Sequence, residues 1–269
     1  WAIRLIVSVM TESITSAKNA LLKEVRRAVS KGTLTEDGFA VAEGFHLLDE
    51  ALASHCNIST VLVSDQVREP IENRVPGDVR VVTIPHTVFS EIASTETSQG
   101  VITLVRPPAW SMDQLLPENA LVMVLDGVQD PGNAGTILRA AEAFGANGVV
   151  LLKGTVNPYN PKCLRASAGS VFRLPLMAGL EESQVLTALQ ERGVALFAAM
   201  PRAPVHASDA PLSKACAIVI GAEGRGVSPT LAQNCISIRI PTSGVESLNA
   251  AIAAAVLLYE ARRQRTENQ

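Results

Sequence analysis

The second half of the sequence alternates short apolar segments with helical ones, and this pattern constrains the fold more than any other feature. The apolar segments lie at 121–125, 148–152, 194–199, 217–220 and 236–240, and the helical segments at 133–145, 184–192, 229–233 and 247–265. Short segments that are apolar throughout are typical of a parallel sheet covered by helices on both faces. Ligands of such sheets bind at the carboxyl ends of the strands. We therefore look for chemistry in the loops after residues 125, 199, 220 and 240.

A proline-rich stretch, Arg106-Pro107-Pro108, followed by polar residues around Asn119, separates this half from the first. It predicts a linker over 107–119 between a first domain, 1–106, and a second domain, 120–269. The first half combines helical spacing over 20–29 and 45–54 with β-rich runs at 59–63, 79–84 and 100–105. The prediction is a small mixed α/β domain ahead of the parallel-sheet domain.

Charge argues against a uniformly basic, nucleic-acid-binding chain, because 23 Lys and Arg are outnumbered by 26 Asp and Glu, for a net charge of −3. Basic residues gather locally instead, in three groups: Arg4, Lys18, Lys23, Arg26, Arg27 and Lys31; Lys153, Lys162, Arg165 and Arg173; and Arg262, Arg263 and Arg265. The first group is open to two interpretations, a solvated helix face or a face that contacts RNA. With 4% aromatic residues, base stacking alone is not expected to hold an RNA.

The cysteines are scattered and indicate neither a disulfide framework nor a zinc site. Cys56, Cys163, Cys216 and Cys235 form no Cys-x-x-Cys pair and no His lies at ligand spacing, so no metal is expected. No stretch approaches the ~18–20 apolar residues of a membrane span, and Arg4 interrupts the apolar start over 1–10. These features predict a cytoplasmic protein with no membrane partner.

The loop after residue 125 contains strong turn chemistry, Asp130-Pro131-Gly132, followed by Asn133. Asn is a favoured helix N-cap, so Asn133 is expected to cap a helix that carries Arg139 in its first turns. Taken alone, this loop is compatible with a simple cap and an exposed helix charge.

The loop after residue 220 is rich in glycine and contains one carboxylate, Glu223. Gly221, Gly224 and Gly226 allow a backbone to approach a ligand closely. Their order differs from the Gly-x-Gly-x-x-Gly of dinucleotide-binding turns, and Glu223 would repel pyrophosphate. A carboxylate here suits a cationic or hydroxyl-bearing ligand, although a tight turn with a solvated Glu is the alternative.

The last loop runs from Ile240-Pro241 through Gly244 to Ser247-Leu248-Asn249. Ser247 is a plausible N-cap of the final helix, with Asn249 in its first turn. This helix is rich in alanine, which raises its propensity and makes it slim enough for close neighbours.

In this order the three loops resemble the motifs of the SpoU/TrmH family of RNA 2′-O-ribose methyltransferases, of the SPOUT superfamily. The motif residues are Asp126, Asp130, Pro131, Asn133, Gly135 and Arg139; Gly221, Glu223, Gly224 and Gly226; and Ile240, Pro241, Gly244, Ser247, Leu248 and Asn249. The segment 165–170 also resembles one that these enzymes carry. In the first half, Thr15-Ser16-x2-Asn19, Ala42-Glu43-Gly44 and Gln99-Gly100 resemble the RNA substrate-binding domain often fused ahead of the catalytic one.

The resemblance implies features that the residue patterns do not show. It implies a deep trefoil knot in the C-terminal domain, and an S-adenosylmethionine (AdoMet) site carried over to Ala199, Gly221, Ile240 and Leu248. It also implies a homodimer with the closing helix in the interface. The fused first domain favours ribosomal RNA over tRNA as the substrate, with tRNA as the alternative.

In the implied reaction the nucleophile is the ribose 2′-hydroxyl, which is a poor one. The enzyme must align it with the methyl group and assist the loss of its proton. Arg139 is the candidate for activating it. Because a guanidinium has a pKa above about 12, we expect Arg139 to act with an RNA phosphate and stabilise oxyanion charge rather than to act as a base. Asn133, Ser247 and Asn249 would position Arg139 and the RNA, and Glu223 would organise the glycine loop or the ribose side of the site.

Two other classes of protein are alternatives to an RNA methyltransferase. A catalytically inactive RNA-binding relative would keep the fold, but the intact Asn133, Arg139 and Glu223 argue against it. A nucleotide-dependent oxidoreductase is disfavoured by the glycine order and by the lack of a suitably placed acidic residue.

Overall fold

The computed structural model describes residues 11–68 and 71–267, and the prediction made for the start of the chain, 1–10, lies outside them. The chain divides into two compact units. Unit 1 contains the residues up to Pro108 together with Tyr159–Phe172, and unit 2 contains Ala109–Pro158 with Arg173 and the residues that follow. In the described part of the chain, no helix is both long and apolar enough to cross a membrane.

Unit 1 is a mixed α/β domain around a sheet with the strand order β1-β4-β3-β5-β2. The strands β1, β4 and β3 are parallel, whereas β5 runs antiparallel to both β3 and β2. Its elements are β1 Thr11–Ser13, α1 Ala20–Lys31, β2 Ala40–Glu43, α2 Phe45–Ala53, β3 Asn57–Ser64, the 3₁₀ turn η1 Ile71–Asn73, β4 Arg80–Ile84, α3 His86–Ser90, β5 Val101–Arg106, α6 Pro161–Ser167 and the 3₁₀ turn η2 Ser170–Phe172. The prediction of a small mixed domain is confirmed.

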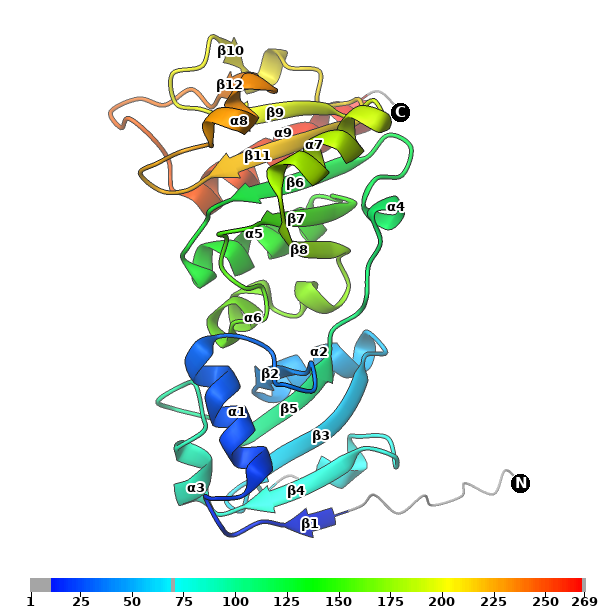
Figure 1. Ribbon diagram of the computed structural model, residues 1–269, viewed down its shortest axis with the longest axis vertical. Coiled ribbons are helices and arrows are strands. Elements are labelled where there is room, and N and C mark those ends of the chain that lie inside the picture. Colours follow the sequence, from blue (N-terminus) through cyan, green and yellow to red (C-terminus); the bar gives the residue numbers. More distant parts are fainter. Residues whose placement is uncertain (1–10, 69–70, 268–269) are drawn as a thin grey trace, which may run out of the picture. The chain divides into compact units, whose positions relative to one another are not determined.

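Two apolar cores lie on opposite faces of this sheet, because alternate side chains of a strand point to opposite sides. Leu22 and Val25 of α1 pack with Leu62 and Val82 on one face. Leu48 of α2 packs with the neighbouring positions of β3 and β4 on the other. Figure 1 shows α1 crossing the sheet of this unit.

Unit 2 is built on a parallel sheet with the order β10-β12-β9-β11-β6-β7-β8 among its described residues. Its elements are α4 Met112–Leu115, β6 Leu121–Asp126, α5 Pro131–Ala143, β7 Gly148–Leu152, β8 Leu176–Leu180, α7 Glu182–Glu191, β9 Ala195–Ala199, β10 Val205–His206, the 3₁₀ turn η3 Ala207–Asp209, β11 Cys216–Gly221, α8 Pro229–Gln233, β12 Ile236–Arg239 and α9 Ala250–Glu267. The predicted parallel sheet is confirmed. The knot stays a prediction.

Helices cover both faces of this sheet (Figure 1). On one face α5 packs against α9, and α9 also contacts β11. On the other face α4, α7 and α8 bury Leu115, Leu189 and Leu231 against the strands. The central strand β6 is buried along its whole length, which explains why its sequence is apolar throughout.

The structure differs from the predicted domain division in two places. The range 107–119, predicted as a linker, contains α4, whose Leu115 joins the core of unit 2, as does Leu116. The segment Tyr159–Phe172, predicted as part of the second domain, packs with unit 1. Its helix α6 contacts β2, and its Gly169 lies so close to Glu50 that a Cβ there would be 2.6 Å from the Glu50 Cβ.

Candidate active site

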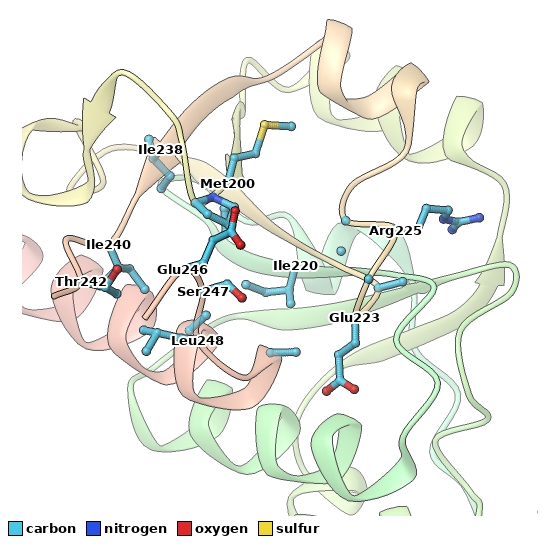
Figure 2. A pocket seen from close by; sticks show the side chains of 18 residues that line it. Met200, Ile220, Glu223, Arg225, Ile238, Ile240, Thr242, Glu246, Ser247 and Leu248 are labelled. Carbon is cyan, nitrogen blue, oxygen red and sulfur yellow. The ribbon is translucent and has the colours of Figure 1, made fainter. Parts of the chain in front are cut away.

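A pocket of about 350 Å³ lies at the carboxyl ends of β9, β11 and β12, entirely within unit 2 (Figure 2). The ends of these strands and the three loops that follow them form it, together with the first turn of α9. Its lining comprises Ala199, Met200, Pro201, Ile220, Gly221, Ala222, Glu223, Gly224, Arg225, Gly226, Ile238, Ile240, Thr242, Glu246, Ser247, Leu248, Ala250 and Ala253. Of the four loops in which chemistry was expected, those after residues 199, 220 and 240 line the pocket, and the loop after residue 125 does not.

The glycine loop after β11 owes its shape to its own backbone. Ala222 and Gly226 exchange two hydrogen bonds, of 3.1 and 2.8 Å, which close the loop into a tight turn. Gly224 and Gly226 have φ values of +90° and +71°, which side chains other than glycine rarely adopt. A Cβ at Gly221 would lie 2.5 Å from the Gly226 carbonyl oxygen, so the two limbs touch only because this position is glycine.

A buried carboxylate, that of Asp126 at the end of β6, contacts this loop through Ser228 and Arg225. Asp126 is 2% exposed and pairs in register with Gly221 of the neighbouring strand. Its Oδ2 accepts a hydrogen bond of 2.6 Å from the Ser228 amide, and its Oδ1 lies 3.5 Å from Nη2 of Arg225. No role for Asp126 is predicted from the sequence. The signal that could have revealed one is a carboxylate at the end of an otherwise apolar strand, where burial requires partners.

Three side chains from the three motifs meet in one hydrogen-bonded cluster. Nδ2 of Asn133 donates to Oε1 of Glu223, and Nδ2 of Asn249 donates to Oδ1 of Asn133 at 3.1 Å and more weakly to Glu223 at 3.5 Å. Figure 2 shows the Glu223 side chain extending downward from the glycine loop. The structure thus brings together residues that are 90 and 116 positions apart in the sequence.

The helix caps near this cluster differ from the predicted ones. Asp130, not Asn133, is the N-cap of α5, and its side chain accepts a bond of 2.8 Å from the Asn133 amide. Pro131 explains the difference, because proline fits the first helical position and leaves the cap to the residue before it. Asn133 is therefore free to use its side chain elsewhere.

The predicted cap of the last helix is also wrong. Asn249, not Ser247, caps α9, since its Oδ1 accepts from the amides of Ala251 at 2.9 Å and Ile252 at 3.3 Å. Ser247 lies before the helix in an exposed segment and lines the pocket. Asn249 thus uses its oxygen on the helix and its amide nitrogen on Asn133, so a single side chain connects α9 to the cluster.

The remaining predicted residues separate into two groups. Ala199, Gly221, Ile240 and Leu248 all line the pocket, together with Ser247 and Glu223. Arg139 does not line it. It stands on an exposed position of α5, and its guanidinium makes no hydrogen bond or ion pair to another residue in the described part of the chain.

Charge at the pocket mouth comes from both signs. Arg202, after β9, and Glu246, after β12, form an ion pair of 2.5 Å between two loops that flank the pocket. Both side chains are largely exposed, so this pair contributes little stability in water. The walls behind it are apolar, with Ile220, Ile238 and Leu248 among them (Figure 2).

The arrangement suits a ligand with an apolar, flat part and polar edges, held by side-chain walls and by backbone groups of the glycine loop. The described lining contains no histidine or cysteine, which removes the usual neutral-pH proton acceptors from the pocket wall. Among residues 11–68 and 71–267, no three His, Cys, Asp or Glu side chains gather in a way that could hold a metal ion.

The parallel sheet of unit 2 carries a pocket formed by the loops after three strands. Comparisons with known proteins identify a protein of this architecture as an RNA methyltransferase. The SpoU rRNA Methylase family model matches residues 120–259, and an MRM3-like substrate binding domain matches residues 19–103. The chain belongs to the SpoU rRNA methylase family.

Individual proteins are similar to this one over nearly the whole chain, in sequence or in structure. The 23S rRNA (guanosine(2553)-2'-O)-methyltransferase RlmP of Bacillus subtilis is 33% identical over 253 residues, 93% of this chain and 99% of that protein. The crystal structure of an AdoMet-bound rRNA methyltransferase from Sinorhizobium meliloti has a TM-score of 0.83 at 30% identity, covering 94% of this chain and 98% of that one. The SpoU methyltransferase AviRb from Streptomyces viridochromogenes, in complex with AdoMet, has a TM-score of 0.84 at 25% identity, covering 93% and 99%.

Proposed function

We propose that this protein transfers a methyl group from AdoMet to a ribose 2′-hydroxyl of ribosomal RNA. The observation that carries the proposal is the Asn133–Glu223–Asn249 cluster, in which all three family motifs meet beside one pocket. Two relatives support the substrate, the reaction and the cofactor, since RlmP is a 23S rRNA 2'-O-methyltransferase and the Sinorhizobium meliloti structure contains AdoMet. Such an rRNA-modifying protein acts in the cytoplasm.

The pocket fits AdoMet in size and chemistry. Its apolar walls suit an adenine ring, and the backbone groups of its glycine loop suit the polar edges of the cofactor. Ala199, Gly221, Ile240 and Leu248 are the residues that would hold the cofactor, with Gly221 allowing the backbone to come close. When bound, AdoMet would supply the electrophilic methyl group.

The residues of this chain then align and activate the hydroxyl. A guanidinium has no acceptor atom, so Arg139 acts by pairing with an RNA phosphate and stabilising the charge that develops on the 2′-oxygen, while the hydroxyl proton is released to solvent. Glu223, held by Asn133 and Asn249, fixes the glycine loop on the ribose side of the site. Ser247, which lines the pocket, is placed to contact the RNA backbone.

The protein functions as a homodimer in this proposal, with α9 in the interface. Three large apolar side chains of α9, Ile252, Val256 and Tyr259, are 54, 39 and 57% exposed and lie one helical turn apart on one side of the helix. A second copy would cover them. Because α5 packs on α9, such a dimer would also bring the partner's α5 toward the site, which is relevant since Arg139 lies outside the pocket of its own chain.

Methyl transfer from radiolabelled AdoMet to protein-free rRNA tests the reaction. After nuclease digestion the label should be found on a 2′-O-methylated nucleoside, and label on a base would contradict the proposal. The same assay with tRNA tests the alternative substrate. Calorimetry with AdoMet tests the alternative of an inactive relative, which would bind RNA without binding the cofactor.

Replacing Arg139 tests its role. Arg139→Ala should lower kcat by about 10²–10³-fold, the usual cost of removing an oxyanion-stabilising group, with the AdoMet Kd within a few-fold of the wild type. Arg173→Ala is the matched control, an arginine of unit 2 paired with Glu142 outside the pocket. A near-native rate for Arg139→Ala would remove this residue from the mechanism.

A further inference from the structure

The far end of α9 is held by the side chain of Arg265, which lies in the last turn of the helix and is half-buried. Its guanidinium donates to four backbone carbonyl oxygens. Nε donates to Leu212 at 3.0 Å and Nη1 to Asn119 at 2.7 Å. Nη2 donates to Ala120 at 3.0 Å and to Lys214 at 2.5 Å. The planar guanidinium thus connects α9 to two separate segments of backbone.

These two segments lead into the two strands that carry the site. Two of the four carbonyls lie just before β6, and the other two lie just before β11. At the opposite ends of the strands, β6 leads to Asn133 and β11 leads to Glu223. Asn249, at the start of α9, donates to these two side chains at 3.1 and 3.5 Å. The helix is therefore attached to the same pair of strands at both of its ends.

Packing near the site does little to fix α9 along its own axis. In the first two turns of the helix the buried side chains are all alanine, namely Ala250, Ala251 and Ala254, and the larger Leu257 and Leu258 come later. Helices are held in register when ridges of side chains fit into grooves, and alanine forms only a shallow ridge. Figure 1 shows α9 running alongside β11. The position of this part of α9 along its axis depends more on the polar contacts at its two ends.

The hydrogen bonds of the cluster are sensitive to such a displacement. The bond from Asn249 to Glu223, at 3.5 Å, is already at the outer limit for a hydrogen bond, so a shift of about 0.5 Å would remove it. Arg265 lies 16 residues from Asn249, or about 24 Å along the helix at a rise of 1.5 Å per residue. This distance is too large for direct contact with the reacting atoms, and the helix itself connects the two residues.

We propose that Arg265 is a positioning residue for methyl transfer, which fixes α9 along its axis and so keeps Asn249 within hydrogen-bonding distance of Asn133 and Glu223. The proposal rests on the proposed function, because the cluster is assigned to that reaction. A displaced cluster aligns the 2′-hydroxyl less well, and a misplacement of about 1 Å can cost about 100-fold in rate. The effect therefore falls on kcat, and substrate binding is retained.

Steady-state kinetics with protein-free rRNA tests this role. Arg265→Ala should lower kcat about 10-fold, with the RNA KM and the AdoMet Kd within about 3-fold of the wild type. The helix stays docked in this variant, because Gln264 still accepts from the Leu212 amide at 3.0 Å. Arg265→Lys should lose less, since an ammonium has three donors for the four carbonyls. A wild-type kcat in Arg265→Ala, or a loss confined to the RNA KM, would overturn the proposal.

Arg263→Ala is the matched control for charge and helix position. Arg263 lies two residues before Arg265, and its guanidinium pairs with Glu260 at 2.8 Å and Glu267 at 2.6 Å on α9 itself. Its removal should leave kcat at the wild-type value. An equal fall in kcat in Arg263→Ala would show that any loss of charge at this end of α9 is sufficient, which contradicts the role of Arg265.

A double-mutant cycle tests whether Arg265 acts through Asn249. Asn249→Ala should itself lower kcat, and adding Arg265→Ala should leave kcat within about 2-fold of the Asn249→Ala value, because both changes act on the same cluster. Losses that multiply would mean that Arg265 acts by another route, and the proposal would be wrong.

Hydrogen exchange separates this proposal from the proposed function, since it requires no RNA. The amides of Ala251 and Ile252 donate to Oδ1 of Asn249 at 2.9 and 3.3 Å. They should exchange at least about 5-fold faster in Arg265→Ala than in the wild type, and at the wild-type rate in Arg263→Ala. Unchanged exchange in Arg265→Ala would overturn the proposal. A wild-type enzyme that methylates no RNA would instead overturn the proposed function.

Discussion

Each unit holds one loop with a buried carboxylate at the end of a strand, but the two loops are held in different ways. Glu43 at the end of β2 accepts hydrogen bonds from the Ser/Thr loop 94–98, with two side-chain bonds of 2.5 Å and one amide bond of 2.7 Å. Asp126 at the end of β6 holds the glycine loop by a single amide at 2.6 Å and a mostly exposed arginine at 3.5 Å.

The difference indicates what each loop is built to do. The side-chain donors of the loop in unit 1 are used internally, so its shape is fixed before a partner arrives. The glycine loop of unit 2 takes its shape from positive φ values and from backbone pairing, which leaves space at its glycines for a ligand. A rigid loop suits the placement of a large substrate, and a bare backbone suits close contact with a small one.

The largest effect on AdoMet binding is expected at Gly221, whose backbone contacts the backbone of Gly226 in the glycine loop. Gly221→Ala would place a Cβ 2.5 Å from the Gly226 carbonyl oxygen, which neither limb of the loop can avoid by a side-chain rotation. The AdoMet Kd measured by calorimetry should rise at least about 100-fold, or about 2.7 kcal/mol. Gly193→Ala is a control for backbone strain alone, because its φ is +64° and its Cβ meets nothing within 4 Å, and it should leave the AdoMet Kd unchanged. Unchanged affinity in Gly221→Ala would mean that the loop is not the cofactor cradle.

The second effect separates stability from cofactor binding. Glu43→Gln removes the charge from a buried acceptor of several hydrogen bonds and should lower the free energy of unfolding by about 2–3 kcal/mol, measured by urea denaturation. The AdoMet Kd should stay at its wild-type value because Glu43 belongs to unit 1. A variant that loses AdoMet affinity and keeps its stability would reverse the comparison between the two carboxylates.

Asp126→Asn should weaken AdoMet binding more than it lowers stability, and both changes should be smaller than those of the preceding variants. The amide oxygen can still accept from Ser228, but the ion pair with Arg225 is lost and the glycine loop is held less firmly. We expect the AdoMet Kd to rise about 10-fold, with a loss of about 1 kcal/mol in unfolding free energy. Glu142→Gln, which removes a carboxylate paired with Arg173 outside the pocket, is the control and should leave the Kd unchanged.

The smallest effect is a dependence of stability on pH that Glu43 contributes. Burial works to raise its folded-state pKa, but the hydrogen bonds from Ser94, Ser98 and Thr95 outweigh burial and hold that pKa below the ordinary glutamate value of about 4.3. Its contribution is thus fully present above that pH and is lost as the pH falls through the lower, folded-state pKa. The difference in unfolding free energy between the wild type and Glu43→Gln should therefore be constant from pH 7 to 5 and shrink below about pH 4. A difference that grows on acidification would contradict the lowered pKa.

Sequence reasoning found the elements whose local pattern and tertiary role agree. The buried strands β6, β7 and β11 are apolar at nearly every position, and burial on both faces leaves no alternative. Two strands of unit 2, β8 and β10, are not predicted from the sequence. The strand β8 contains Gly179 and exposed side chains at the edge of the sheet, and β10 has only two residues, so neither produces an apolar run.

The residues of the candidate site could be predicted from the sequence, but the hydrogen bonds between them could not. Motif order identified Asn133, Glu223 and Asn249, but whether their side chains cap helices or bond to one another depends on Pro131 and on the exact start of α9. The packing of Tyr159–Phe172 on unit 1 could not be read from the sequence either. Its partners, such as Gly32 and Glu50, lie more than 100 residues away and follow no local period.

The path of the chain has a consequence for exchanging parts between relatives. The polypeptide passes between the two units near residue 108, again near 158 and again near 172. A single cut in the 107–119 region therefore does not release an independent catalytic fragment. Such a fragment would carry Leu164, Val171 and Phe172 with their covering surface removed, and would be prone to aggregate. A chimera that is to remain soluble must take 159–172 from the same parent as its first hundred residues.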